Sequence, residues 1–155
     1  MPRTVISDTS TLILFQKIGN IDLINKVYGE IIITPEVAGE FGETLPEWIK
    51  TKPASDKKYQ KILETQIDNG EASIIALAKE FDNALLLLDD LKARKLAAKL
   101  NIRITGTLGI IHKAKQMSII EKVKPLIDKL LQTDFRASNN IIRELLILND
   151  EDTDH

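Results

Sequence analysis

Residues 84–90 read ALLLLDD, an uninterrupted apolar run followed directly by two aspartates. Such a run indicates a strand that is buried on both faces, as strands of parallel sheets are. An ionised carboxylate at the end of a buried strand is unfavourable unless another group compensates its charge. Asp89 and Asp90 are therefore the first candidates for a functional site.

The same pattern recurs near the start of the chain, where the strand predicted at residues 4–7 is followed by Asp8. Ligands of open parallel sheets bind outside the carboxyl ends of the strands. Asp8 therefore meets the two aspartates of the first run if their strands are neighbours. Glu40 and Glu71 lie in predicted helices between these strands. Carboxylates that converge repel one another, and a hard divalent cation with oxygen ligands is the usual remedy.

Strands and helices alternate along the chain. The predicted strands are residues 4–7, 31–33, 84–88 and 102–104. This alternation predicts an α/β fold with a short parallel sheet sandwiched between helices. Residues 45–58 contain prolines and read as a loop. We expect a single domain over residues 1–149 and an acidic, frayed tail over residues 150–155.

Helix starts are predicted where a polar side chain precedes an apolar, helical stretch. The predicted starts are Thr9-Ser10, Asn20, Thr34-Pro35, Ser55, a capping box of Ser118 and Glu121, and Ser138. Asp68-Asn69-Gly70 is predicted to break the chain before an apolar helix over residues 71–81.

Composition limits the class of protein. The chain has 155 residues and a net charge of −2, so any binding of nucleic acid needs a local basic patch. Lys92 and Arg94 follow the acidic pair and are the candidates to bind a phosphate backbone, although a solvated helix face also explains them. The chain has no cysteine, which excludes disulfides and fits a cytoplasmic protein. No apolar run approaches the ~20 residues of a membrane span, so no membrane contact is expected.

Each acidic candidate also has a structural interpretation. Asp8 and Glu71 suit the first turn of a helix, whose dipole favours negative charge there. Glu40 lies at the margin of a buried helix face, where a solvated acid is equally expected. Asp89 and Asp90 point in different directions because they are adjacent, so one can bind a metal ion while the other caps the next helix.

Hydroxyl side chains near the predicted site form a second group of candidates. Thr9 and Ser10 follow Asp8, and Thr107 lies in the turn before the helix over residues 108–117. Such hydroxyls orient a carboxylate or a bound water. Helix capping is the alternative role for each of them.

Segments spread over the whole chain resemble the motifs of the PIN-domain family, in the same order. They are VISDTSTLI (5–13), TPEVAGEF (34–41), GEASIIALA (70–78), LLLLDDLKAR (85–94) and TGTLGIIHKAK (105–115). The last is similar to a helix found in a subgroup of prokaryotic PIN proteins. The similarity extends from residue 4 to residue 148.

The resemblance implies a Rossmann-like α/β/α fold and a ribonuclease that depends on Mg²⁺ or Mn²⁺. Carried over by motif, Asp8 is the first metal ligand, Glu40 the second acid, Glu71 the third, and Asp90 or Asp89 the fourth. The metal ligands implied are thus Asp8, Glu71 and one or both of these aspartates. Many VapC-like relatives are dimeric toxins blocked by an antitoxin protein, so the implied partners are RNA, a second copy and an antitoxin.

The chain departs from the toxin pattern at the fourth and third acids. Many toxin relatives carry threonine or serine shortly before the fourth acid, whereas Leu88 and Asp89 precede Asp90 here. The third acid is Glu71, where aspartate is common. The choice between Asp89 and Asp90 therefore stays open, and toxicity is not assumed.

Other classes of protein fit the acidic pattern less well. A phosphatase of the haloacid-dehalogenase type needs a second aspartate where this chain has Ser10. A response-regulator receiver needs a lysine at a strand end, and none of the predicted strands ends in lysine. A non-catalytic PIN-fold binding or regulatory module is the remaining alternative, and the presence of all the acids argues against it.

Overall fold

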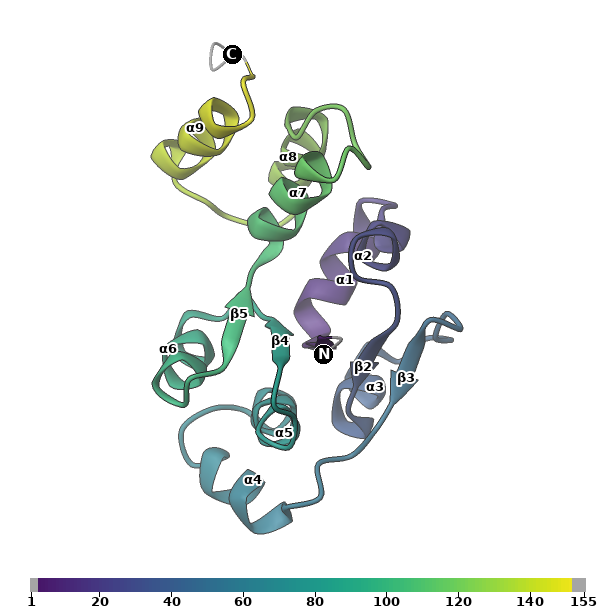
Figure 1. Ribbon diagram of the computed structural model, residues 1–155, viewed down its shortest axis with the longest axis vertical. Helices are drawn as coiled ribbons and strands as arrows, with labels where there is room; N and C mark the ends of the chain where they lie inside the picture. The colour runs from purple at the N-terminus through teal and green to yellow at the C-terminus, as the bar shows by residue number, and fades with distance from the viewer. Residues whose placement is uncertain (1–2, 152–155) are drawn as a thin grey trace.

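A parallel sheet forms the centre of the molecule in the computed structural model, which describes residues 3–151 (Figure 1). Within these residues the strands are β1 (Thr4–Ser7), β2 (Ile31–Ile33), β3 (Ile49–Thr51), β4 (Ala84–Leu87) and β5 (Arg103–Thr105). Their order is β3-β2-β1-β4-β5, and each neighbouring pair is parallel. The predicted α/β class is therefore confirmed.

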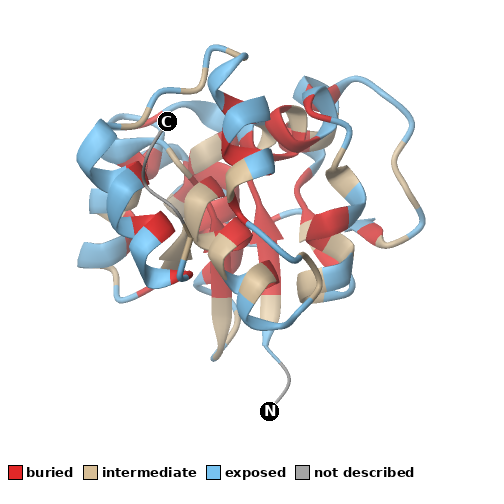
Figure 2. Cartoon of the chain, turned by 90° about the horizontal axis from the view of Figure 1, so that it is seen from above, coloured by how far each residue is buried: buried red, intermediate tan, exposed pale blue. Residues whose placement is uncertain are grey.

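Helices connect the strands and flank the sheet. They are α1 (Thr9–Lys17), α2 (Ile21–Tyr28), α3 (Pro35–Phe41), α4 (Lys57–Leu63), α5 (Asn69–Ala78), α6 (Leu91–Lys99), α7 (Thr107–Gln116), α8 (Lys124–Leu131) and α9 (Asn139–Leu148). The chain moves one way across the sheet from β1 to β3 and the other way from β4 to β5. Right-handed crossovers then put helices on both faces. Figure 2 shows the strands as a buried centre, with exposed residues on the outer sides of the helices.

The change of direction brings β1 and β4 side by side. Ser7 pairs with Leu87 at the carboxyl ends of these strands, so both strands end at the same level. Asp8 follows β1, while Asp89 and Asp90 follow β4. Open α/β sheets bind ligands in the crevice at such a switch point, and the acids lie at its edge.

The core explains why these strands lack alternation in sequence. Ile6 of β1 and Leu86 of β4 are fully buried, and α5 is buried continuously from Ala72 to Ala78. A strand covered on both faces carries apolar residues at every position. The same deep burial leaves the following carboxylates close to an apolar interior.

The strand β3 is the one that the sequence does not reveal. It lies inside the predicted loop 45–58 and pairs with β2, from Ile49 opposite Ile31 to Thr51 opposite Ile33. Only Ile49 of this strand is buried. An edge strand with one buried residue has no apolar pattern, and backbone pairing with β2 stabilises it.

Aspartates cap helices where serine or threonine was expected. Asp8, rather than Thr9 or Ser10, caps α1. Asp56, rather than Ser55, caps α4. Aspartate accepts hydrogen bonds from the first N–H groups as well as serine does, and its charge also suits the positive end of the helix dipole.

Two further predicted helix boundaries are wrong. Ser118 has a positive φ of 59°, and α8 begins beyond Glu121, so the predicted capping box does not form. Asp68 caps α5, which places Gly70 inside the first turn of that helix instead of in a break. The predicted starts that the structure confirms are Asn20, Thr34-Pro35 and Ser138.

Glu151 anchors the end of the described chain. Its carboxylate accepts hydrogen bonds from the backbone N of Val123 at 2.7 Å and of Lys124 at 3.1 Å, and it pairs with Lys115 at 2.9 Å. Of the predicted tail 150–155, residues 152–155 lie outside the described residues, and the single domain over 1–149 stays a prediction. In the described part of the chain, no helix has the length and apolar character that crossing a membrane requires.

Candidate active site at the carboxyl edge of the sheet

Asp8 and Asp90 lie at the carboxyl edge of the sheet, because they follow the central strands β1 and β4. Asp8 Oδ1 accepts a hydrogen bond from Thr11 N at 2.9 Å, and Asp90 Oδ2 accepts one from Ala93 N at 2.9 Å. Asp8 is buried, with 4% of its surface exposed, whereas Asp90 is exposed. Each carboxylate caps its helix with one oxygen, so its other oxygen can bind a ligand.

The start of α5 brings further carboxylates to the same edge. Asp68 Oδ1 accepts a hydrogen bond from Glu71 N at 2.8 Å. Burial, followed by the negative charges of Asp68, Asp90 and Asp8, raises the pKa of Glu71 to about 7. These four acids therefore lie within electrostatic reach of one another.

Asp68 is the acid of this group that the sequence interpretation missed. The tripeptide Asp68-Asn69-Gly70 first indicates a break in the chain. The sequence does contain a signal for the role of Asp68. An aspartate, which suits the N-cap position, stands three residues before Glu71 and in front of an apolar helix.

The environment of Asp8 is unusual for a carboxylate. Burial raises its pKa to about 6, hydrogen bonding by Thr11 lowers it, and the charge of Asp89 raises it again. The hydroxyl of Thr11 is itself fully buried and has no hydrogen-bond partner among the described residues. An ionised Asp8 is therefore only partly compensated by its neighbours.

Glu40 reaches the site from α3. Thr9 Oγ1 donates a hydrogen bond to Glu40 Oε1 at 3.0 Å. A Cβ at Gly70 would collide with this same oxygen, so the glycine allows Glu40 to approach the start of α5. Behind this contact, the buried hydroxyls of Thr34 and Ser73 lie 2.6 Å apart and join α3 to α5.

A small polar cavity lies among these residues. It has a volume of about 30 Å³ and is lined by Asp8, Thr9, Ser10, Glu40, Asp68, Gly70 and Glu71. A water molecule has a share of about 30 Å³ in the liquid, so the cavity suits one ion or water. The lining side chains end in carboxyl or hydroxyl oxygens, which Mg²⁺ and Mn²⁺ prefer as ligands.

Asp89 has a different set of partners from Asp90. Its Oδ1 accepts a hydrogen bond from Thr107 N at 2.9 Å, and its Oδ2 accepts one from Thr107 Oγ1. Both oxygens thus fasten the start of α7 to the end of β4. Asp90 uses one oxygen to cap α6, and its negative charge raises the pKa of Glu71. Asp90 is therefore the better candidate metal ligand of the two aspartates.

The acids of the site have no ion-pair partner among residues 3–151. The ion pairs found there are Lys17–Asp134, Lys57–Glu36, Lys115–Glu151 and Lys124–Asp128. Of the predicted phosphate-binding residues, Lys92 is exposed on α6. Arg94 is half-buried and donates a hydrogen bond to Leu88 O at 3.1 Å. Neither forms an ion pair with the carboxylates.

The donor chemistry fits a divalent cation, although the carboxylates are not already assembled around one point. No group of three or more His, Cys, Asp or Glu residues in the described chain is arranged to hold a metal ion. The raised pKa values of Asp8 and Glu71 reflect burial and mutual repulsion, which a bound cation compensates.

The comparison with protein families covers almost the whole chain. A family model described as a PIN domain matches residues 4–151. The match includes each of the acids described above and the sheet that carries them. A comparison with curated proteins found no match.

Proposed function

The chain belongs to the PIN-domain family, and on this premise we propose that it is a metal-dependent ribonuclease that hydrolyses RNA phosphodiester bonds. PIN domains are generally nucleases. One observation carries the proposal for this chain: Asp8, Asp68 and Asp90 lie within electrostatic reach of Glu71 at the switch point, and none of the four has an ion-pair partner among residues 3–151. A cluster of uncompensated carboxylates beside a cavity of one ion's size suits metal-assisted hydrolysis.

The residues take distinct roles in this proposal. Asp8 and Asp90 hold a Mg²⁺ or Mn²⁺ ion. When bound, such an ion lowers the pKa of water and stabilises the charge that develops on the phosphate. Glu71 and Glu40 act as further ligands or orient the attacking water. Thr9 supports Glu40 through the hydrogen bond to Oε1.

Glu71 holds its proton unusually tightly in the metal-free protein. Burial and the neighbouring acids raise its pKa to about 7, and a bound cation would lower that pKa again. Asp89 supports the site indirectly, because its hydrogen bonds with Thr107 fix the segment that also carries Asp90.

Cleavage of a labelled RNA with the Asp8→Asn variant tests this function. Asparagine preserves the size of the side chain and the cap of α1, so the fold should be retained. We expect the wild-type protein to cleave RNA with Mn²⁺ and not with EDTA, and Asp8→Asn to lose this activity. The matched control is Asp56→Asn, which changes the cap of α4 outside the site and should cleave normally. Near wild-type cleavage by Asp8→Asn would remove Asp8 from the mechanism.

One observation favours a second candidate, a PIN-fold module that binds without catalysis. The described residues contain no cluster of three or more His, Cys, Asp or Glu side chains that is arranged to hold a metal ion. Calorimetric titration with Mn²⁺, with and without an RNA oligonucleotide, separates the candidates. Binding of Mn²⁺ supports the ribonuclease, whereas RNA binding without any Mn²⁺ binding supports the module.

The resemblance to VapC-like proteins supports finer proposals on biological role. The chain acts in the cytoplasm and forms a homodimer. It is the toxin of a toxin–antitoxin pair. Growth arrest on expression, relieved by a protein encoded beside it, tests the toxin role. Light scattering of the purified protein tests the dimer.

A further inference from the structure

Two grooves beside the site share an aromatic side chain. The larger has a volume of about 440 Å³ and the smaller about 280 Å³, and both are lined by Phe135 and Asp89. Phe135 lies in the connection between α8 and α9, beyond the motifs that carry the acids. Phe135 is only partly buried there, so part of its side chain faces the grooves.

Hydrogen bonds hold the segment around Phe135 in a defined conformation. Phe135 N donates a hydrogen bond to Thr133 Oγ1 at 3.0 Å. Arg136 Nη1 donates hydrogen bonds to Thr133 O at 3.0 Å and to Phe135 O at 2.9 Å. Phe135 also packs against the core cluster while staying partly exposed. The ring is therefore held in place before any ligand binds.

Cationic side chains line the same grooves as Phe135. Arg94 and Arg136 line the larger groove, and Lys17 lines the smaller one. Two acids are also present: Asp89 is bound by Thr107, and Asp134 lies 3.9 Å from Lys17. An exposed aromatic ring with adjacent cations is the combination that binds single-stranded nucleic acid, by stacking of bases and attraction of phosphates.

The smaller groove adjoins the acidic site. Ser10 lines both the smaller groove and the cavity that contains Asp8 and Glu71. Asp89, which lines both grooves, precedes Asp90 in the chain. The smaller groove and the acidic cavity therefore adjoin at Ser10.

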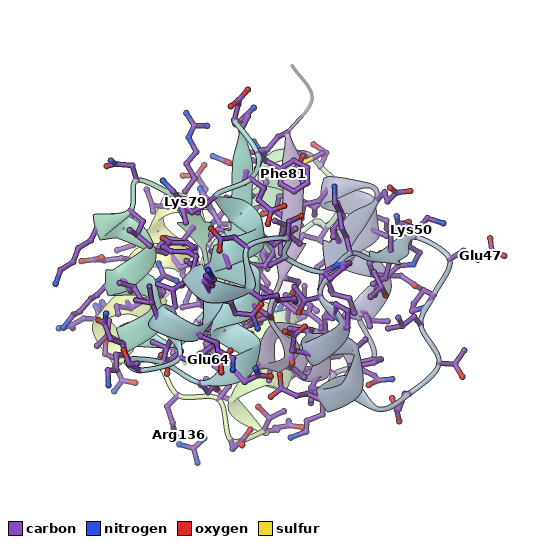
Figure 3. All side chains as sticks on the ribbon, turned by 90° about the horizontal axis from the view of Figure 1, so that it is seen from below. Glu47, Lys50, Glu64, Lys79, Phe81 and Arg136 are labelled. Carbon is purple, nitrogen blue, oxygen red and sulfur yellow. The ribbon has the colours of Figure 1, made fainter. Side chains whose placement is uncertain are left out.

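We propose that Phe135 stacks a base of single-stranded RNA next to the scissile phosphate, with Arg94 and Arg136 facing its backbone. This inference rests on the proposed ribonuclease function, because it names how the same site recognises its substrate. It predicts a preference for unpaired RNA, since a base within a duplex is not free to stack on the ring. Figure 3 shows Arg136 at the rim of the molecule, on the side away from Phe81.

Binding of a labelled single-stranded RNA, measured by fluorescence anisotropy with Ca²⁺ in place of Mn²⁺, tests the inference. Phe135→Ala should weaken binding roughly 5-fold to 150-fold, the range that loss of one stacked base produces. Phe135→Trp should bind as the wild-type protein does, and its fluorescence should be quenched by the RNA. Phe135→Leu keeps an apolar side chain without a π face, and it should bind like the alanine variant.

Two controls separate stacking from an effect on folding. Phe81→Ala removes another partly exposed phenylalanine, at the opposite edge of the sheet, and should not change RNA affinity. An oligonucleotide that lacks its bases should bind the wild-type and Phe135→Ala proteins equally. Wild-type affinity in Phe135→Leu, or failure of the wild-type protein to bind single-stranded RNA, would overturn the inference.

The binding assay also distinguishes this inference from the proposed function. Cleavage by the wild-type protein, together with unchanged affinity in Phe135→Ala, refutes the stacking role and leaves the ribonuclease intact. Affinity that depends on Phe135 in a protein that never cleaves RNA supports the stacking role and refutes the ribonuclease.

Discussion

Replacing Asp8 by asparagine should stabilise the metal-free protein at neutral pH. Asparagine retains the oxygen that caps α1 and removes only the negative charge. Asp8 is 4% exposed, and burial, together with the charge of Asp89, raises its pKa to about 6 despite hydrogen bonding by Thr11. Ionisation of Asp8 in the folded protein is therefore unfavourable, and the variant avoids it.

The shift in the pKa of Asp8 gives the sign and the size of this effect. The pKa rises from 3.8 to about 6 on folding, so the folded state holds the proton more tightly than the unfolded state. The free energy of unfolding then falls as the pH rises through this interval and is level above it. One pKa unit corresponds to about 1.4 kcal/mol, so we expect Asp8→Asn to gain at most about 3 kcal/mol above pH 7 and little at pH 4.

Thermal unfolding in EDTA at both pH values measures the difference. A gain of this size raises the melting temperature by about 2–4 °C per kcal/mol in a chain of this length. EDTA is required because a bound cation would stabilise ionised Asp8. Asp56→Asn is the control, since it changes an exposed cap away from the site. The reasoning is refuted if Asp8→Asn is less stable than the wild type at neutral pH, or if the difference is the same at pH 4.

Other substitutions test the supports around the site and the end of the chain. Gly70→Ala should reduce RNA cleavage at least about tenfold with a small change in stability, because its Cβ displaces Glu40; unchanged cleavage would contradict this. Thr107→Val should lower the free energy of unfolding by about 1–2 kcal/mol, since it removes a half-buried hydrogen bond to Asp89. Urea unfolding checks this, and Thr107→Ser, which keeps the hydroxyl and loses only a methyl group, should retain the hydrogen bond. Glu151→Gln should destabilise the protein at neutral pH and progressively less as the pH falls. Burial raises the pKa of Glu151, but its hydrogen bonds to α7 and α8 outweigh this effect and lower the pKa overall. An equal loss of stability at all pH values would refute this.

The strands β1 and β4 were predictable because their signal is local. In β1 the apolar pair Val5-Ile6, and in β4 a longer apolar run, shortly precede acids. The structure confirms both strands and places them side by side. The strand β3 was not predictable, since only Ile49 of it is buried. Its pairing with β2 depends on contacts that a sequence window does not contain.

The site shows the same division between local and tertiary information. Asp8 is predictable as an acid that follows a strand and Glu71 as an acid at the start of a helix, and the structure brings them within electrostatic reach of each other. Asp68 was missed because the glycine after it favours a break. The bonding of Asp89 with Thr107 joins residues from different strand ends, so the sequence left the choice between Asp89 and Asp90 open.

Anomalous diffraction from crystals soaked in Mn²⁺ tests the central claim most directly. We expect an anomalous peak between the carboxylates of Asp8 and Asp90, and we expect it to disappear in Asp8→Asn crystals. A site that stays empty at saturating Mn²⁺ in the wild-type protein, or Mn²⁺ bound only elsewhere, would contradict a cation held by these acids.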